Sequence, residues 1–448
     1  MLDQRLQTRV ENFVSRLKRE DVCMHGFILS VKGEIKATAY YAPFKEGQPH
    51  RMYSISKSMT AIAIGILLEK GKLHLDDHIT DYFADYLPET PDDRLLRLTI
   101  RDMLRMATCY RSTAYREGVD ENWTKPFFTA ASTHEPGTVF HYDTGCSQVL
   151  AALVARLTDQ EVIDFLNEQV FEPIGATDEK FWLRDPSGTC QGGTGLCMSL
   201  RDLHKVVRLI MEGGGGLIPR WFCEEMGQKH IDNCLCTNEE ERYGYGWQVW
   251  MTRCGWAMYG LGGQLAVICP EKDVCLCTIA DTRLDNVGVQ RIYNTFYEEL
   301  YPYIGMEDMD PICLSLSVQA LENLPDCALE AAGPYFFADF NQLSLKSVEL
   351  RGNELIWENA WGKNSLRFGV GENLVDTFPG WPQLPTLCSG GWIEPGLLRV
   401  RCWIIGNAPC GVDMLLHFGE ECLTVQSRKS FDPATNAYEG VASGYVGR

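Results

Sequence analysis

Residues 53–68, which read YSISKSMTAIAIGILL, decide the fold. After Lys57 the segment is almost entirely apolar, so it predicts a helix that is buried on all sides at the centre of the molecule. Ser54 stands at the start of this helix, and Lys57 follows three residues later on the same helical face. A lysine is costly to bury unless it is paired or has a chemical role. The Ser54–Lys57 pair therefore calls for a functional explanation.

Nucleophilic catalysis is one such explanation. Burial lowers the pKa of a lysine because desolvation penalises the charged ammonium form. A neutral amine beside a serine hydroxyl is a competent base, and such a base makes serine a useful nucleophile. The alternative is a serine that caps the helix and a lysine that extends to solvent. Ser15 and Lys18 have the same spacing in a segment that predicts a polar-faced surface helix, so the spacing alone is a weak signal.

A third candidate group is Tyr142, in the segment PGTVFHYDTG at residues 136–145. A phenol near a lysine cation is expected to have a lowered pKa. It would then pass a proton between Ser54 and the substrate. The alternative for this tyrosine alone is packing in the core.

Composition limits the classes of function. The 448 residues include 45 % apolar and 23 % charged residues, which is typical of a globular protein with two domains or one domain with an appendage. A formal charge of −19 argues against nucleic-acid and membrane-surface partners. No apolar run suggests a membrane span, and the charged N-terminal segment does not resemble a secretory signal, so a cytoplasmic location is expected. The 18 cysteines lack zinc-ligand spacing and predict reduced thiols without a structural metal.

Two regions differ in their patterns. Residues 1–305 predict an α+β domain with an antiparallel sheet and a helical cluster, and residues 306–448 predict a β-rich domain of barrel or sandwich type. The second region has a two-residue hairpin turn at Gly352-Asn353. In the first region, a helix is expected from Ser54 to about residue 70, where Gly71 supplies a left-handed cap. Further helices are expected over 2–20, after a cap at Thr99, over 146–156 and 161–170, from Ser199 to the glycines at 213–216, and over 287–300. Strands are expected over 25–31 and 35–41, and in YGYGWQVWM, GWAMYG, LAVIC and VCLCTIA between Tyr243 and Ile279.

The order of these segments resembles the superfamily of serine β-lactamases and penicillin-binding proteins, and within it the class C β-lactamase and esterase-like branch. Besides the S-x-x-K motif, six segments carry the resemblance: GKLHLDDHITDYF at 71–83, TIRDMLRMAT at 99–108, PGTVFHYDTG at 136–145, GTGLCMSLRDLHKVVRLIMEGG at 193–214, YGYGWQVW at 243–250 and GLGGQLAVICPEKDV at 260–274.

The resemblance implies that Ser54 is acylated, that Lys57 is its general base and that Tyr142 also activates water for deacylation. It implies an oxyanion hole made by the backbone amide of Ser54 and a second amide. The second amide is that of Gln264 if Leu261 takes the place of the family's strand cation, or that of Gly263 if Gly260 does. The substrate is expected to contact the following residues: Thr144, Leu261, Gly262, Trp247 and Tyr243.

Two departures from the family pattern restrict the class of substrates that the protein is expected to accept. Thr144 stands where the family has asparagine, and neither Gly260 nor Leu261 supplies a cation for a substrate carboxylate. The sequence therefore predicts a cofactor-free serine hydrolase for an ester or amide of small to medium size, such as a short peptide-like molecule, and not an efficient β-lactamase. Arg111 is one candidate for replacing the missing cation.

Two rival functions remain. The same two departures favour a non-catalytic binding protein of the penicillin-recognising type. A thiol hydrolase is a second rival, because residues 188–192, GTCQG, match a nucleophile elbow around Cys190. That motif needs a buried strand before it, whereas the preceding residues RDPS predict a loop.

Overall fold

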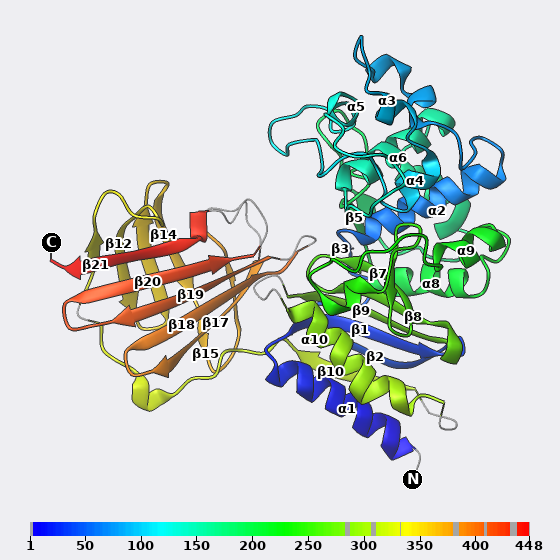
Figure 1. The fold of residues 1–448 in the computed structure, drawn as a ribbon. Helices are drawn as coiled ribbons and strands as arrows, with labels where there is room; N and C mark the ends of the chain where they lie inside the picture. Colours follow the sequence, from blue (N-terminus) through cyan, green and yellow to red (C-terminus); the bar gives the residue numbers. More distant parts are fainter. Residues whose placement is uncertain are drawn as a thin grey trace.

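The computed structural model describes residues 3–282, 287–305, 311–331, 333–379, 385–406, 410–430 and 437–447. Figure 1 shows two lobes, a larger α+β body and a smaller all-β lobe that contains the C-terminus. Buried apolar side chains form two clusters in the body and a third inside the smaller lobe. The fold class predicted from the sequence, α+β with a C-terminal β-rich lobe, is confirmed.

Seven strands form the sheet of the body, in the order β10-β2-β1-β9-β8-β7-β6. Neighbouring strands are antiparallel except β10, which runs parallel to β2. Strands β1, β8 and β9 are buried along almost their whole length because helices cover both faces of the sheet. The strand bounds are β1 Cys23–Val31, β2 Glu34–Ala42, β6 Trp250–Thr252, β7 Gly255–Gly260, β8 Gln264–Cys269, β9 Val274–Asp281 and β10 Ile312–Ser317.

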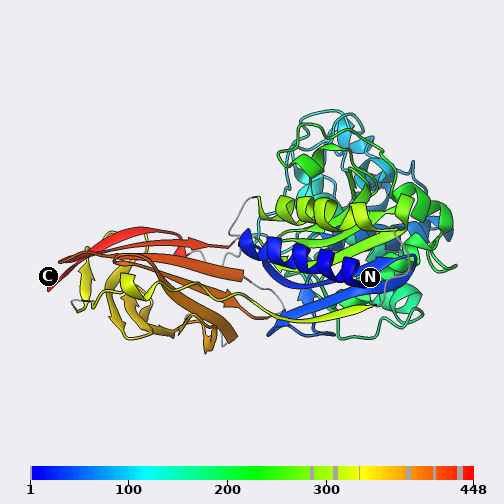
Figure 2. The same cartoon turned by 90° about the horizontal axis from the view of Figure 1, so that it is seen from below.

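Two helices cover one face of this sheet and the remaining helices lie on the other. Helices α1 (Asp3–Arg19) and α10 (Gly288–Thr295) lie side by side on the first face, in front of the sheet in Figure 2. Helix α10 continues as a π-helical turn, Phe296–Leu300. The other face carries α2 (Ile55–Glu69), α8 (Leu200–Met211) and α9 (Arg220–Met226), and the helical subdomain lies beyond α2 in Figure 1.

The helical subdomain surrounds α2, which is the central helix that the sequence predicts. Every residue of α2 from Ile55 to Leu67 is buried. Gly71 has a φ of 64°, which supplies the left-handed residue expected at the end of this helix. The predicted cap at Thr99 is a full capping box with Asp102. The helices around α2 are α3 Asp93–Leu96, α4 Ile100–Leu104, α5 Lys125–Thr129, α6 Thr144–Thr158 and α7 Val162–Leu166. Helix α7 continues as a π-helical turn at Asn167–Phe171.

A small sheet fixes the segment that leads into α2. Strands β3 (His50–Arg51), β5 (Leu196–Met198) and β4 (Phe181–Trp182) form it in the order β3-β5-β4. This pairing ties the residues before Ser54 to the loop that precedes α8.

The expected strand YGYGWQVWM is mostly not a strand, because only Trp250–Thr252 pairs within the sheet. The chain turns at Gln248, whose φ is 57°. The buried side-chain amide of Gln248 donates to the carbonyl of Met103 at 2.9 Å and accepts from the Ser147 hydroxyl at 2.7 Å. These tertiary hydrogen bonds to α4 and α6 override the strand propensity of the aromatic residues.

The smaller lobe is a sheet that is nearly closed as a barrel. Its strands follow the order β14-β13-β12-β11-β21-β20-β19-β18-β17-β15, and β16 pairs with β17. The predicted turn at Gly352 joins β12 to β13, and Gly352 has a φ of 58°. The strand bounds are β11 Tyr335–Phe337, β12 Leu345–Arg351, β13 Glu354–Asn359, β14 Gly362–Arg367, β15 Gly369–Val370, β16 Leu374–Thr377, β17 Pro385–Glu394, β18 Leu397–Ile404, β19 Cys410–Phe418, β20 Cys422–Lys429 and β21 Gly440–Val446.

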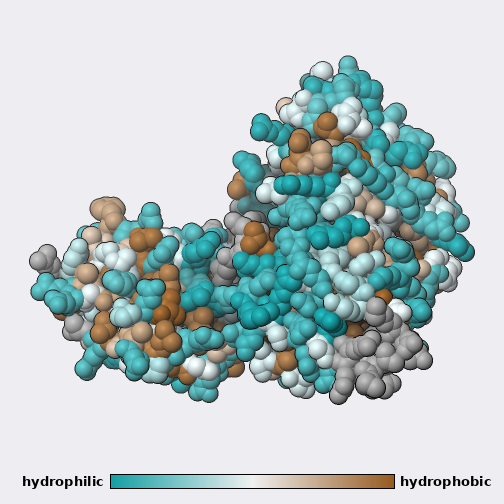
Figure 3. Space-filling model, turned by 60° about the horizontal axis from the view of Figure 1, so that its bottom comes forward, coloured by the Kyte–Doolittle hydropathy of each residue, from teal (hydrophilic) through white to brown (hydrophobic). Residues whose placement is uncertain are grey.

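The predicted division between residues 305 and 306 stays a prediction, but β10, which follows it, completes the sheet of the body and not the barrel. The barrel meets the body on the α1 face: Trp403 and Ile405 of the barrel pack in the same apolar cluster as α1 and α10. Figure 3 shows the two lobes from below, with a band of apolar side chains on the smaller one. Among the described residues, no helix has the length and apolar character that crossing a membrane requires.

Candidate active site

Ser54 stands at a sharp entry into α2. The N–H of Met52 donates to the Leu196 carbonyl at 2.8 Å, which anchors the chain to β5. Tyr53 then has a φ of 46°, a left-handed conformation that is unusual for a residue with a side chain. Such strain clusters at functional sites. The turn brings Ser54 to the N-terminus of the helix, where its side chain keeps some exposed surface.

The Nζ atom of Lys57 lies 3.1 Å from the Ser54 hydroxyl oxygen. Lys57 is 1 % exposed, although it is a lysine. Desolvation lowers its pKa to about 7, against an opposing attraction from Asp143. The amine is therefore close to half neutral at physiological pH, in hydrogen-bonding contact with a hydroxyl.

A backbone carbonyl holds the amine of Lys57 in place. Nζ donates to the carbonyl oxygen of Gly193 at 2.8 Å. A Cβ atom at Gly193 would lie 2.5 Å from Cγ2 of Thr144 and 3.1 Å from Nζ itself. Only glycine fits between these two side chains. Thr144, where the sequence predicts a substrate contact, thus packs on the loop that fixes Lys57.

Tyr142 completes the cluster. Nζ of Lys57 lies 4.9 Å from the centre of the Tyr142 ring. Desolvation raises the pKa of Tyr142, although a hydrogen bond with the Ser54 side chain acts in the opposite direction. The expectation of a lowered pKa is wrong, because burial outweighs a neighbouring amine that is itself half neutral. Tyr142 is therefore a protonated phenol that can donate a hydrogen bond.

An acidic residue next to Tyr142 was not predicted. Asp143 caps α6 by accepting from the Gly145 amide at 2.8 Å and from the Thr113 hydroxyl at 3.0 Å. It is fully buried, and desolvation raises its pKa. Its second carboxylate oxygen has no hydrogen-bond partner among the described residues. Asp143 is the main charge that acts on Lys57.

The turn between β7 and β8 lies against the residues before Ser54. A Cβ atom at Gly260 would lie 2.1 Å from the carbonyl oxygen of Met52, so only glycine allows this approach. The amide of Gly263 donates to the Gly260 carbonyl at 3.3 Å, which commits it to the turn. In the described chain, the amides of Leu261 and Gly262 have no backbone acceptor.

The predicted oxyanion donors are the backbone amides of Ser54 and of either Gln264 or Gly263, and the structure gives each of these residues different neighbours. Gln264 begins β8 and pairs with Gly260 in the ladder. Its buried side chain donates to the carbonyls of Leu261 and Ala280, both at 2.9 Å. Gln264 thus braces the turn with its side chain. Near Ser54, the amide of Ile55 donates to the Met52 carbonyl, and the amide of Lys57 donates to the Ser54 carbonyl. The amide of Ser54 itself has no backbone acceptor among the described residues.

The two aromatic residues predicted to contact the substrate differ in their exposure. Trp247 is 2 % exposed and stacks on His230, with ring centres 4.8 Å apart. Tyr243 lies at the surface with 41 % of its area exposed. The ring that packs on Tyr142 is instead that of Trp250, at 5.2 Å. The chain turns at Gln248, so the side chains of residues 243–249 do not alternate between two faces as they would in a continuous strand.

Glu241 is a further charge near the site that the sequence did not reveal. It lies in a 3₁₀ turn, Glu239–Arg242, where its two preceding glutamates pair with Arg253. Glu241 has no cationic partner within bridging distance among the described residues, and accepts only from the Asn238 amide at 2.9 Å. Desolvation raises its pKa. Its charge acts on Tyr142 and on Tyr259 at the end of β7.

The remaining candidates from the sequence are Cys190 and Arg111. Cys190 is in the predicted loop, fully buried, and desolvation raises its pKa to about 12. Such a thiol is a poor nucleophile at neutral pH. Arg111 is exposed and its charge acts on His141. The glycines 213–216 all have positive φ in a turn after α8, as expected of a loop.

The chain is similar in sequence and in fold to several known proteins. A family model described as Beta-lactamase matches residues 24–299. The 6-aminohexanoate-dimer hydrolase of Paenarthrobacter ureafaciens is 24 % identical over 225 residues, which are 47 % of this chain and 57 % of the relative. Esterase EstB of Burkholderia gladioli is 25 % identical over 185 residues, 37 % of this chain and 47 % of the relative. The chain thus spans about half the length of these curated relatives.

One solved structure extends the likeness to the barrel. The octameric penicillin-binding protein homologue from Pyrococcus abyssi has a TM-score of 0.52 and 14 % sequence identity, and the match covers 98 % of this chain and 99 % of that chain. At this identity the likeness concerns the fold alone. Both lobes therefore recur together in another protein.

Proposed function

The chain belongs to the beta-lactamase family, and from that premise we propose that it is a serine hydrolase that forms an acyl-enzyme on Ser54. The observation that carries the proposal is the buried amine of Lys57, 3.1 Å from the Ser54 hydroxyl and with a pKa of about 7. A purely structural lysine gains nothing from desolvation beside a serine hydroxyl. A general base needs a pKa near the working pH.

In the proposed acylation, Ser54 Oγ attacks the carbonyl carbon of a bound ester or amide while its proton passes to neutral Nζ of Lys57. The new C–O bond pushes an electron pair onto the carbonyl oxygen. Tyr142 then donates its phenolic proton to the leaving oxygen or nitrogen and regains one from the Lys57 ammonium. The bond to the leaving group breaks, and the acyl group stays on Ser54.

Deacylation would run through the same groups in reverse. Water attacks the acyl carbon, and its proton passes through Tyr142 to neutral Lys57. The Ser54–acyl bond breaks as Lys57 returns a proton to Oγ, which releases a carboxylic acid. The raised pKa of Tyr142 supports a role as a neutral relay and not as a standing phenolate.

We propose that the backbone amides of Ser54 and Leu261 hold the developing oxyanion. The Ser54 amide has no backbone acceptor in the described chain, and it lies at the N-terminus of α2, where the helix dipole favours negative charge. Leu261 directly follows Gly260, whose backbone lies against the Met52 carbonyl. This choice replaces both donors expected from the sequence: the amide of Gly263 is committed to the turn, and Gln264 pairs with Gly260 in the ladder.

The proposed substrate is an ester or amide of small to medium size that lacks a carboxylate next to the scissile bond. Gly260 and Leu261 supply no cation. The half-buried carboxylate of Glu241 supports the same conclusion, because its charge acts on Tyr142. Two charges of the same sign in a partly desolvated site repel each other strongly.

The test is labelling with a fluorophosphonate probe, followed by peptide mapping and an assay with a chromogenic acetate ester. We expect one adduct, on Ser54, and ester turnover that is lost in Ser54→Ala. Ser15→Ala is the matched control, because Ser15 and Lys18 repeat the spacing on the exposed face of helix α1. Turnover that survives in Ser54→Ala would refute the nucleophile.

The rival function, a non-catalytic binding protein, predicts a different result. A binder would give no turnover and no adduct in folded protein, yet a β-lactam or peptide ligand would raise its melting temperature. Folding is checked by far-ultraviolet circular dichroism in both variants. The two functions are therefore separated by the same samples.

A further inference from the structure

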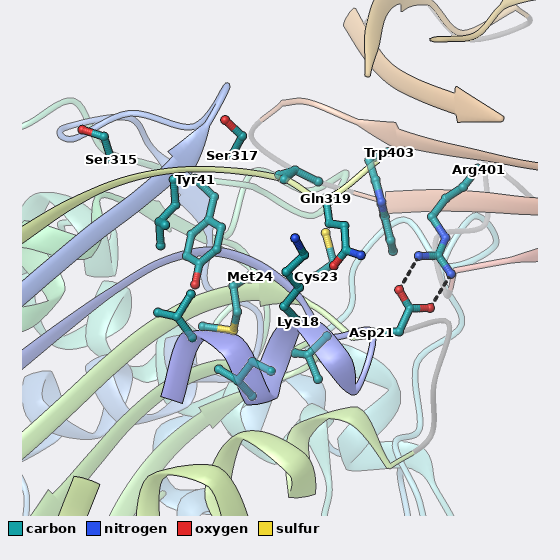
Figure 4. Close-up of a pocket in the computed structure, with 15 residues that line it drawn as sticks. Lys18, Asp21, Cys23, Met24, Tyr41, Ser315, Ser317, Gln319, Arg401 and Trp403 are labelled. Atoms are coloured by element: carbon teal, nitrogen blue, oxygen red, sulfur yellow. Dashed lines mark hydrogen bonds and ion pairs between the residues drawn. The ribbon is translucent and has the colours of Figure 1, made fainter. Parts of the chain in front are cut away.

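A cavity of about 280 Å³ lies where the barrel meets the body, and we call it the junction cavity. Figure 4 shows it between α1, the start of β1, the segment after β10, and β18 of the barrel. Cys23, the first residue of β1, lines the junction cavity and is half-buried. In Figure 4 its side chain lies among those that surround the cavity. A small molecule that enters the cavity therefore meets a thiol.

A buried histidine lies behind this thiol. Sγ of Cys23 is 3.6 Å from Nε2 of His25, a hydrogen-bonding distance for sulfur. The ring of His25 is fully buried and stacks on that of Phe44, with centres 3.8 Å apart. The register of β1 on β9 shifts between Met24 and Gly26, which places His25 at a β-bulge. Bulges occur next to active sites, where they redirect a side chain.

A second buried histidine fixes which nitrogen of His25 carries the proton. Nδ1 of His50 lies 3.2 Å from the carbonyl oxygen of Arg51, and a carbonyl only accepts, so this nitrogen is the donor. In the neutral ring, Nε2 of His50 is then an acceptor. It lies 3.0 Å from Nδ1 of His25, which is therefore the donor of that pair. Nε2 of His25 is left as the acceptor that faces the thiol of Cys23.

These three side chains have the arrangement of an activated nucleophile. Such a site has a nucleophile, a base within hydrogen-bond reach of it, and a third group that orients the base. Cys23, His25 and His50 hold these positions in turn. The alternative is that Cys23 serves only as a small apolar residue. The buried thiols of Cys146 and Cys197 are of that kind, because they donate to backbone carbonyls, which do not act as bases.

We propose that Cys23 is a second nucleophile of this protein and that it forms a mixed disulfide with a small disulfide that enters the junction cavity. His25 takes the proton of the thiol, and His50 is a positioning residue that holds the His25 ring. The apolar side chains of Leu17 and Trp403 at the cavity suit the aliphatic part of such a disulfide, because burial of apolar surface is favourable.

The exchange needs no oxidant other than the disulfide itself. The thiol proton passes to Nε2 of His25 as Sγ of Cys23 attacks one sulfur of the disulfide. A new S–S bond forms, and the old S–S bond breaks with its electron pair on the departing sulfur. The departing thiolate takes the proton from Nε2 of His25 and leaves as a thiol. Ser54 has no part in this step, which is therefore independent of the proposed hydrolysis.

The test is thiol–disulfide exchange with bis(2-hydroxyethyl) disulfide on the full-length protein at pH 7. Samples are quenched with acid at successive times, and peptide mapping by mass spectrometry gives a separate rate constant for each cysteine. Cys313 is exposed and serves as the internal reference. An ordinary thiol is only a few per cent ionised at pH 7, so a thiol with its own base reacts faster. We expect Cys23 to react at least about tenfold faster than Cys313, although it is less exposed.

Two pairs of variants separate the roles of the histidines. His25→Gln keeps an acceptor for the thiol but cannot take its proton, so the Cys23 rate should fall about tenfold, to that of Cys313. His417→Gln, which replaces an exposed histidine of the barrel, is the matched control and should change neither rate. His50→Leu removes the acceptor of Nδ1 of His25 and should lower the Cys23 rate several-fold. His50→Gln keeps an acceptor there and should preserve the rate.

Folding of each variant is checked by far-ultraviolet circular dichroism. In the original protein, a Cys23 rate no higher than that of Cys313 would overturn the proposal without any variant. Equal Cys23 rates in folded His25→Gln and His417→Gln would overturn it as well, since the base would then have no effect. Equal rates in His50→Leu and His50→Gln would overturn the role of His50.

Discussion

The Nζ atom of Lys57 donates to the backbone carbonyl oxygen of Gly193 at 2.8 Å. This contact joins the central helix to a loop 136 residues further along the chain. Thr144, which stands where the family resemblance leads one to expect asparagine, packs against the same glycine. The carbonyl cannot rotate as a side chain can, so it holds the amine rigidly beside Ser54.

Substitution of Gly193 should therefore disturb the amine without unfolding the protein. In Gly193→Ala the new methyl group would lie 2.5 Å from Cγ2 of Thr144 and 3.1 Å from Nζ of Lys57. We expect ester turnover to fall on the order of a hundredfold, because a displacement of about 1 Å in a catalytic group costs that much. The measurement is kcat/KM for a chromogenic ester, with the melting temperature recorded in parallel.

A second substitution tests the cause. Thr144→Ser removes Cγ2, which is the nearest atom to the new methyl group. The double variant Gly193→Ala, Thr144→Ser should regain much of the lost activity. If it is no better than Gly193→Ala alone, then the close approach between Gly193 and Thr144 does not position Lys57.

The pH dependence of acylation should follow Lys57. Its pKa is lowered to about 7 by desolvation, and only the neutral amine accepts the proton of Ser54. We expect kcat/KM for a neutral ester to rise with pH through an apparent pKa near 7 and then to level off. A profile that is flat between pH 5.5 and 9 would contradict the role of Lys57 as the base.

Asp143→Asn should move that profile to lower pH. The Asp143 charge favours the ammonium form of Lys57, so its removal lowers the lysine pKa further. Asparagine still accepts hydrogen bonds from the Gly145 amide and the Thr113 hydroxyl, so the cap of α6 is kept. If the apparent pKa of the profile falls by half a unit, then kcat/KM below that pKa, relative to its plateau, rises roughly threefold in Asp143→Asn. An unchanged limb would show that another group titrates.

Much of this arrangement was accessible from the sequence. The apolar run after Ser54 predicted the buried helix, because no other element explains a run that is hydrophobic on every side. The buried lysine and its lowered pKa followed from that helix. The glycines at 71 and 352 marked a helix end and a hairpin, since both positions require positive φ.

Other features depend on contacts between distant segments. Gln248 turns the chain because its amide bonds to α4 and α6, and no local pattern announces those bonds. The strand expected over residues 243–251 is therefore mostly absent, and the substrate contact expected of Trp247 stays a prediction. Likewise, the expected effect of a lysine cation on a nearby phenol predicted a lowered pKa for Tyr142, whereas burial, which depends on the packed structure, raises it. Gly193 and Glu241 had no sequence signal for their roles.

Lys57 should also leave a signature in stability. Its pKa is about 7 in the folded protein and about 10.4 in an unfolded chain. Between these values the unfolded chain binds a proton that the folded one lacks, so the free energy of unfolding rises with pH. The slope is about 1.4 kcal/mol per pH unit for one proton.

Lys57→Met removes this titration while it keeps a long apolar side chain. We therefore expect the stability of the original protein relative to Lys57→Met to increase between pH 7.5 and 9.5 in urea unfolding experiments. Groups that do not interact with Lys57 titrate equally in both proteins and cancel in the difference. A difference that stays constant with pH would mean that Lys57 keeps its ordinary pKa in the fold.

The last prediction is that Glu241 discriminates against substrates that carry a negative charge. Glu241 is half-buried, accepts one hydrogen bond, from Asn238, and exerts its charge on Tyr142. Glu241→Gln keeps an acceptor for the Asn238 amide but removes the charge. We expect kcat/KM for an ester that bears a carboxylate to rise roughly fivefold, which corresponds to about 1 kcal/mol of transition-state stabilisation. The value for the matched neutral ester should stay constant.

The assay should be run at pH 8, where Lys57 is mostly neutral and the carboxyl of Glu241 is more fully ionised. Glu239→Gln is the matched control, because that residue faces Arg253 in the same turn. High salt should weaken the discrimination in the original protein and leave Glu241→Gln unaffected. Equal gains for the neutral and the charged ester would indicate a change in shape, and equal effects of the two glutamine variants would indicate a diffuse surface charge. Only a gain that is confined to the charged ester and to Glu241→Gln supports a carboxylate that excludes anionic substrates from Ser54.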